Sequence, residues 1–236
     1  MTITSETITI PVGEATMNAY VARPESGRAP AMIVFQEAYG VTEQLQDVAR
    51  RLAQQGYLAI APELFHRSAA PGFIAPYTNF AAIVPHMEIA TTEAIEEDVR
   101  AVYEWLLGDR QVDPGHIGSI GFCMGGRASF IANSVIPLKA AVSFYGGGLV
   151  PKLLPKAGQQ HGPVLFLWGG LDKNIGPEYR AQVAEAMRVN SKPYIAIEFS
   201  DADHAFFRDV WPATYNPAAA REAWALTLAF LATNLK

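Results

Sequence analysis

The single cysteine of the chain lies in the stretch Gly121-Phe-Cys123-Met-Gly125. An apolar run precedes it and a helical pattern follows, which is the context of a nucleophile held on a sharp strand-to-helix turn. The two glycines suit such a turn, because side chains there would collide with the neighbouring strand and helix. The helix N-terminus would also favour a thiolate at Cys123. The competing interpretation is a buried structural cysteine, which the glycine frame disfavours.

A histidine and an aspartate follow the predicted nucleophile at the ends of later apolar runs. His204 follows the last predicted strand, and Asp172 lies just past Pro163–Trp168. The chain order nucleophile, acid, histidine is the order of α/β-hydrolases. His204 would pair with the thiolate and protonate the leaving group, while Asp172 would orient the imidazole, although Asp172 alone could equally be a turn residue. Asp201 and Asp203 are rival acids, but they lie too close to His204 in the chain to reach its far nitrogen easily.

Alternating strand and helix patterns would position these residues on one sheet. The predicted strands are Thr7–Ile10, Asn18–Arg23, Ala31–Gln36, Tyr57–Ala61, Ile117–Phe122, Leu138–Tyr145, Pro163–Trp168 and Tyr194–Phe199. The predicted helices are Glu43–Gln55, Thr91–Leu107, a segment after Cys123 that ends near Asn133, Pro177–Val189 and Ala218–Leu235. The first two strands would form a hairpin. The remaining order predicts an α/β fold, a mostly parallel sheet with helices on both faces.

Length and composition suit a single globular domain. The chain has 236 residues, 50% of them apolar, and no linker divides it, so we expect a single domain over residues 1–236. A net charge of −5 with scattered basic residues argues against nucleic acid as a partner. The first ten residues lack the features of a secretory signal, and the most apolar stretch, Ala223–Ala232, is about half a membrane span, so we expect no membrane association. One cysteine allows no internal disulfide and favours a cytoplasmic location.

Four motifs together resemble the dienelactone hydrolase family (carboxymethylenebutenolidases). They are Gln36-Glu37-Ala-Tyr-Gly40-Val41, Gly121-Phe-Cys123-Met-Gly-Gly126, Gly169-Gly-Leu-Asp172 and His204-Ala-Phe-Phe-Arg208. The match runs from about Ala31 to the C-terminus, and cysteine in place of serine at the turn makes it specific. The resemblance implies an α/β-hydrolase fold. It also implies a hydrolase that opens a small lactone or carboxylic ester through a cysteine thioacyl intermediate, with a Cys-His-Asp triad and no cofactor.

The resemblance implies roles for further residues. Glu37 matches an acidic residue that contacts the resting thiol and helps to generate the thiolate, although it could simply cap the helix that follows. The backbone N–H groups of Ala38 and Met124 would form the oxyanion hole. Arg208 matches an arginine that grips a substrate carboxylate, a task for which a guanidinium is suited as a bidentate donor.

The segment Pro62–Ala90 interrupts the regular alternation, and segments of such length are typical of lids and binding loops. In the family this region supplies a second arginine and aromatic residues. Here it contains no Lys or Arg after Arg67, although Tyr77 and Phe80 could form an aromatic wall against a substrate. A less anionic ester or lactone therefore fits as well as dienelactone itself.

Two other functions stay open. One is a general esterase or thioesterase with the same triad, and the other is a non-catalytic ligand-binding protein on a hydrolase fold. The presence of all three triad residues favours an enzyme. No pair of histidines has the spacing of a zinc-binding helix, so we expect no metal site. The expected partner is a small-molecule ester or lactone, and the sequence makes no prediction of an oligomer.

Overall fold

Eight strands join in one sheet in the computed structural model, which describes residues 2–25 and 27–235. The strands are β1 (Ile3–Val12), β2 (Ala15–Pro24), β3 (Ala29–Phe35), β4 (Leu58–Pro62), β5 (Val112–Phe122), β6 (Ala140–Phe144), β7 (Val164–Gly169) and β8 (Tyr194–Phe199). Their order across the sheet is β1-β2-β4-β3-β5-β6-β7-β8. The β1–β2 hairpin is antiparallel and pairs antiparallel with β4, whereas all other neighbours are parallel. The predicted mostly parallel sheet is confirmed.

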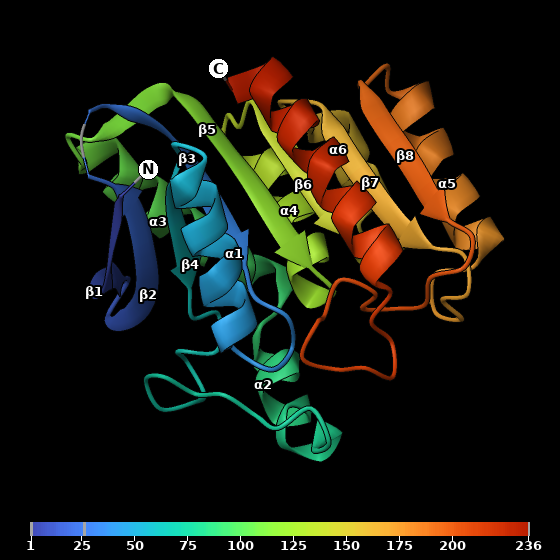
Figure 1. Cartoon of the computed structure of the whole chain (residues 1–236), viewed down its shortest axis with the longest axis horizontal. Coiled ribbons are helices and arrows are strands. Elements are labelled where there is room, and N and C mark those ends of the chain that lie inside the picture. The colour runs from blue at the N-terminus through green and yellow to red at the C-terminus, as the bar shows by residue number, and fades with distance from the viewer. Residues whose placement is uncertain (1, 26, 236) are drawn as a thin grey trace.

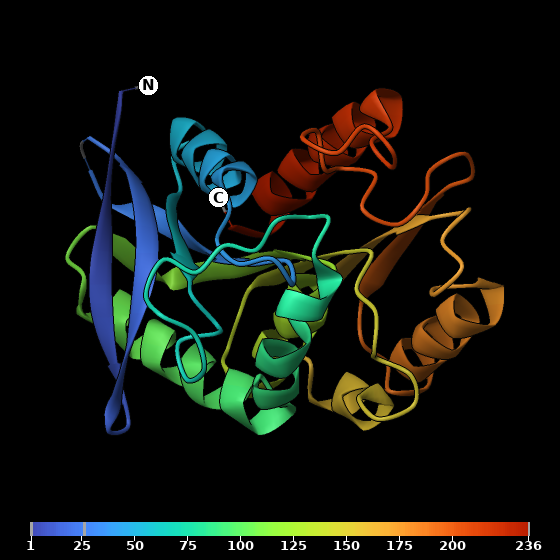
Figure 2. The same cartoon turned by 90° about the horizontal axis from the view of Figure 1, so that it is seen from below.

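Helices cover both faces of the sheet, as Figure 2 shows. One face carries α1 (Glu43–Gln54) and α6 (Pro217–Leu235), and the other carries α3 (Thr92–Gly108), α4 (Met124–Val135) and α5 (Pro177–Val189). Strands β4, β6 and β7 are buried at every position, which explains their continuous apolar sequences. Within the described ranges, no helix has both the length and the apolar character that a bilayer crossing requires.

The motifs singled out in the sequence lie at one edge of this sheet. The parallel strands β3, β5, β6 and β7 all end at this edge, and residues 36–41, 123–127, 145–148 and 170–172 follow them directly. Figure 1 shows two further segments beyond the same edge, residues 63–91 after β4 and residues 200–216 after β8. Side chains that are far apart in the chain therefore meet at the carboxyl ends of the strands, where open α/β sheets bind their ligands.

The segment between β4 and α3 contains two short helical pieces that the sequence does not predict. They are η1 (Phe80–Ala82) and α2 (Val84–Ile89). Each is too short to show a helical repeat of apolar residues. The side chain of Asn79 accepts a hydrogen bond from the Ala82 N–H at 3.2 Å and so caps η1. Pro85 lies in the first turn of α2, where its missing N–H group costs nothing.

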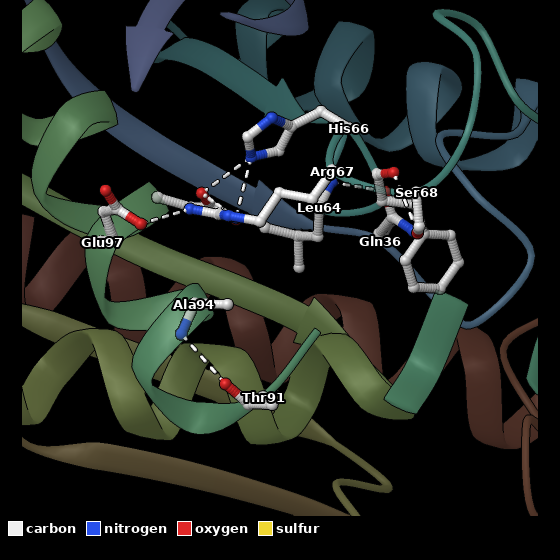
Figure 3. A network of polar contacts seen from close by, with 10 residues as sticks. Gln36, Leu64, His66, Arg67, Ser68, Thr91, Ala94 and Glu97 are labelled. Atoms are coloured by element: carbon white, nitrogen blue, oxygen red, sulfur yellow. Dashed lines mark hydrogen bonds and ion pairs between the residues drawn. The ribbon is translucent and has the colours of Figure 1, made fainter. Parts of the chain in front are cut away.

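A partly buried ionic cluster, here called the β4–α3 anchor, fixes the start of this segment (Figure 3). Its members are His66, Arg67, Glu97 and Asp98. Arg67 donates to Asp98 Oδ1 at 2.7 Å and to Glu97 Oε2 at 2.6 Å, and His66 Nε2 lies 3.0 Å from the same Asp98 oxygen. Asp98 is only 1% exposed, so the arginine compensates a carboxylate that water cannot reach. The anchor therefore ties the segment to α3.

Candidate active site

Cys123 lies on the turn between β5 and α4 in a strained conformation, with φ 56° and ψ −115°. The glycines on either side permit this turn. A side-chain carbon at Gly121 would lie 1.9 Å from the Gly125 carbonyl oxygen, and one at Gly125 would lie 2.2 Å from the Phe35 carbonyl oxygen. Strand and helix thus approach too closely for any larger residue. The turn lifts the half-buried thiol of Cys123 out of the sheet, at the N-terminus of α4.

Asp172 and His204 are joined by a short hydrogen bond beside this turn. Nδ1 of His204 lies 2.6 Å from Oδ2 of Asp172, whose side chain is fully buried. The other carboxylate oxygen accepts the N–H groups of Asn174 and Ile175 at 2.9 and 3.2 Å. One oxygen of Asp172 therefore closes a turn and the other holds the imidazole. The interpretation of Asp172 as a turn residue and its interpretation as the partner of His204 are compatible.

The electrostatics of the pair favour a charged imidazole. Burial lowers the pKa of His204, but hydrogen bonds to Asp172 and Cys123, together with the negative charges of both, raise that pKa to about 10. Burial acts to raise the pKa of Asp172, yet the hydrogen bond and charge of His204 and the two backbone donors lower it. The arrangement thus holds an imidazolium between a carboxylate and the sulfur of Cys123.

The rival acids lie elsewhere. Oδ1 of Asp203 accepts the backbone N–H of His204 at 2.6 Å, which orders the loop but does not reach the ring. Both Asp201 and Asp203 are exposed. Among the described residues, the carboxylate that touches the imidazole of His204 is that of Asp172.

Glu37 is fully buried at the end of β3 and is held by two partners. Its Oε2 accepts the Nε–H of Arg208 at 2.8 Å, and its Oε1 accepts the hydroxyl of Tyr145 at 3.4 Å. Tyr145 has a positive φ of 37°, and its ring centroid lies 5.1 Å from that of His204. Burial, followed by the charge of Glu37, raises the pKa of Tyr145 well above its usual value, so its proton stays on the phenol oxygen. The hydrogen bonds of the Glu37 carboxylate therefore go to Arg208 and Tyr145.

Arg208 lies between two aromatic rings. Its guanidinium carbon is 4.6 Å from the centroid of Tyr77 and 5.3 Å from that of Tyr39, which fits cation–π contacts on both sides. Burial lowers the pKa of Arg208, but the charge and the hydrogen bond of Glu37, together with the charges of Tyr145 and Tyr77, outweigh burial and raise it. The structure thus brings Tyr77 from the 63–91 segment onto Arg208, whereas Phe80 is 60% exposed on η1, outside this cluster.

Two backbone donors face no acceptor near the thiol. Ala38 follows Glu37 at the end of β3, and Met124 opens α4. Both are 4% exposed, and within residues 2–25 and 27–235 neither N–H group has a hydrogen-bond acceptor. Buried N–H groups are rarely left without an acceptor, so these two donors are available to a ligand.

Sequence reasoning missed Tyr39 and Tyr145. Tyr39 lies inside the motif that contains Glu37, and the signal that could have found Tyr145 is its position directly after a parallel strand.

In the described part of the chain, no three His, Cys, Asp or Glu side chains are placed to hold a metal ion.

Comparison with known proteins shows the family of the chain. The model of the dienelactone hydrolase family matches residues 17–235. The chain belongs to this family. A protein of Escherichia coli O157:H7 named "Putative carboxymethylenebutenolidase" is 37% identical over 229 residues, which cover 91% of this chain and 82% of that protein. A protein of the same name from Methylorubrum extorquens is 34% identical over 227 residues, covering 92% of this chain and 77% of its own length.

A solved structure shows the same fold. The crystal structure named "Putative Dienelactone Hydrolase" from Klebsiella pneumoniae superposes with a TM-score of 0.90 at 32% identity and covers 98% of this chain and 99% of that one. The resemblance stated from the four motifs and the α/β-hydrolase fold are confirmed. The chain is therefore a hydrolase of the dienelactone hydrolase family.

Proposed function

We propose that this dienelactone hydrolase family member hydrolyses a carboxylic ester or lactone with Cys123 as nucleophile, His204 as acid and base, and Asp172 as the residue that orients His204. The observation that carries this proposal is the 2.6 Å bond between His204 and Asp172, next to the glycine-framed turn of Cys123. The raised pKa of His204, caused in part by Cys123, supports a thiolate–imidazolium pair at rest.

In the proposed reaction the thiolate attacks the carbonyl carbon and forms a C–S bond, while the carbonyl electrons move to oxygen. The tetrahedral intermediate collapses, the C–O bond to the alcohol breaks, and His204 gives its proton to the leaving alkoxide. Neutral His204 then takes a proton from water, and the hydroxide attacks the thioester. Departure of the thiolate releases the carboxylic acid and restores the imidazolium–thiolate pair.

The negative oxygen of both tetrahedral intermediates needs donors that are already in place. The N–H groups of Ala38 and Met124 are suited to this role because both are buried without an acceptor in the described chain. Donors that need no rearrangement stabilise the transition state more than the ground state.

Glu37 and Arg208 form the substrate-recognition part of the proposal, with Tyr77 as an aromatic wall. Glu37 occupies the Nε of Arg208 and leaves the terminal guanidinium nitrogens for a substrate oxygen. The single arginine of the 63–91 segment, Arg67, is engaged in the β4–α3 anchor, which supports a substrate range that includes neutral esters.

We also propose that the chain works as one domain, since all described strands join a single sheet. A thiolate nucleophile is easily oxidised, and a reducing compartment such as the cytoplasm suits it.

The direct test is to trap the acyl enzyme. After 4-nitrophenyl butyrate is mixed with the protein and quenched in acid, intact-mass spectrometry should show one added butyryl group, mapped by peptide analysis to Cys123, the one cysteine in the sequence. Cys123→Ala should lose the adduct and about 10³-fold or more of kcat/KM. Turnover by Cys123→Ala at the wild-type rate, or an adduct on another residue, would refute the proposal.

A further inference from the structure

Strand β8 ends the sheet, and every second residue of it directs its backbone polar groups away from the protein (Figure 1). The carbonyl oxygens of Pro193 and Phe199 accept hydrogen bonds from N–H groups of β7 and of the residue after it. Odd-numbered residues of β8 therefore face β7. The N–H and C=O groups of Tyr194, Ala196 and Glu198 point outward, where no strand of the described chain pairs with them.

Apolar surface follows this open strand on the side of α6. A groove of about 460 Å³ lies between β8 and α6, and none of its described lining residues is charged. Ile195 and Ile197 form its β8 wall, and Leu226 and Phe230 belong to its α6 wall. Ile195 is 49% exposed, although it belongs to a sheet whose other parallel strands are largely buried. The most apolar stretch of the sequence, which lies in α6, thus borders an uncovered groove.

A second groove follows the same strand on the side of α5. It measures about 300 Å³ and is lined by Ala196, Glu198 and Trp168, among others. Nε1 of Trp168 is buried, and in the described part of the chain it has no hydrogen-bond acceptor. Because buried donors nearly always have an acceptor, this groove also lacks a group that a partner could supply.

The charged side chains next to β8 do not guard its open edge. Proteins commonly block such an edge with charges that oppose pairing. Here Nζ of Lys192 donates to the carbonyl oxygen of Gln160 at 2.8 Å, and Glu198 forms an ion pair with Arg180 at 3.1 Å. Both charges are thus engaged within their own chain. By contrast, β1 at the other end of the sheet exposes the polar residues 4–7 and offers little apolar contact.

We propose that two copies of this chain pair antiparallel through β8, about a two-fold axis at Ala196. Only a strand can satisfy the outward backbone groups, and outward-facing residues must lie opposite one another. With Ala196 opposite its counterpart, Tyr194 lies opposite Glu198, so the two sets of outward groups match and no like charges meet.

This register also disposes of the apolar groove. It places Ile195 opposite Ile197 of the second copy, on the side of α6, so the two grooves form one continuous apolar surface. The small side chain at Ala196 lets the strands approach at the axis. The strand is therefore complementary to itself, which favours a second copy over an unrelated peptide as the occupant.

Sedimentation velocity over a series of protein concentrations tests the pairing. Ala196→Pro removes an outward N–H group and leaves the hydrogen bonds to β7 in place, and Ile195→Lys puts a charge into the groove. Each should raise the dissociation constant of the dimer about tenfold or more. Ile89→Lys changes an isoleucine of similar exposure, 45%, on α2 and should leave the constant unchanged. If Ala196→Pro does not fold, Ile195→Lys still decides. A monomeric wild type, or a dimer that both variants leave intact, would overturn the proposal.

Amide hydrogen exchange of the wild type, resolved by residue, tests the strand pairing without any substitution. The odd-numbered amides of β8 bond to β7 and should exchange slowly at every protein concentration. The amides of Tyr194, Ala196 and Glu198 should exchange rapidly in dilute protein and about tenfold or more slowly in concentrated protein. A dimer that covers β8 with side chains alone would not produce this alternation. Exchange of the three outward amides that does not depend on concentration would therefore overturn the proposal.

Discussion

The imidazole of His204 is bonded to Asp172 through Nδ1 and also hydrogen-bonds to Cys123, and these two contacts set its charge. A serine hydrolase removes the proton of its nucleophile during attack, because a hydroxyl is far too weak an acid to ionise at rest. With the pKa of His204 raised to about 10, the proton is already on the ring at neutral pH. In the proposed enzyme His204 therefore does not have to remove a proton from the nucleophile during attack. Its task in the first half of the reaction is to protonate the leaving group.

Replacing Asp172 by asparagine tests this arrangement. Asp172→Asn keeps the shape but removes the negative charge that helps to raise the pKa of His204, so the titration midpoint of the ring should move below about 10. We expect kcat/KM for 4-nitrophenyl butyrate to fall by about 10²–10⁴. The midpoint is measured by NMR of the His204 ring protons, with the exposed Asp201→Asn as control. A midpoint that does not move would exclude Asp172 as the orienting acid.

The residues that local sequence patterns reveal differ from those that only the fold reveals. Cys123 stands in a local frame of glycines, and Asp172 and His204 follow apolar strands, so all three can be proposed from the sequence. Tyr145 reaches Glu37 from 108 residues further along the chain, and no local pattern encodes that hydrogen bond.

At the scale of elements, the contact between α4 and β3 fixes the position of Cys123. Gly125→Ala would place a carbon 2.2 Å from the Phe35 carbonyl oxygen, which is backbone and cannot move aside cheaply. The free energy of unfolding should fall by about 1–3 kcal/mol or more. Gly108→Ala, at the end of α3 with nothing within 4 Å, should leave it unchanged or slightly raised. Urea unfolding measures the free energy of unfolding of both variants. Equal values for Gly125→Ala and Gly108→Ala would contradict the close packing at this turn.

Long elements with a clear repeat are predictable from the sequence, and short ones are not. The expected helix Pro177–Val189 and strand Tyr194–Phe199 coincide with α5 and β8. The hairpin strands are longer than expected, since β1 begins at Ile3 in an exposed, polar stretch that pairs with β2 through backbone hydrogen bonds. The six residues of α2 depend on contacts with the rest of the segment, which a local window of sequence does not contain.

For the whole molecule, the His204–Asp172 pair links the free energy of unfolding to pH. The pKa of His204 rises from 6.5 to about 10 on folding, so its stabilisation is fully present below about pH 6.5 and is lost as the pH rises through about 10. The lowered pKa of Asp172 acts in the opposite sense, with stabilisation present above its usual 3.8 and lost as the pH falls through the folded value. Both contributions are complete only in mildly acidic solution.

We therefore expect the stability difference between the wild type and His204→Gln to be largest near pH 5–6 and to shrink steadily towards pH 10. Urea denaturation at a series of pH values measures it. His161→Gln replaces an exposed histidine and serves as the control, because its difference from the wild type should stay flat. A difference that grew with pH would mean that folding lowers the pKa of His204 rather than raising it.

The β4–α3 anchor has a consequence for how such a protein can diverge. Residues 63–91 join the rest of the fold at β4 and α3, and the anchor holds them there through side chains of the segment and of α3. None of Cys123, Asp172 and His204 belongs to this segment, whereas Tyr77 does. Mutation or recombination can therefore change this segment, Tyr77 included, while Cys123, Asp172 and His204 are inherited unchanged. We expect proteins of this fold to vary most in this segment. The anchor residues His66, Arg67, Glu97 and Asp98, which hold the segment to the rest of the fold, should vary least.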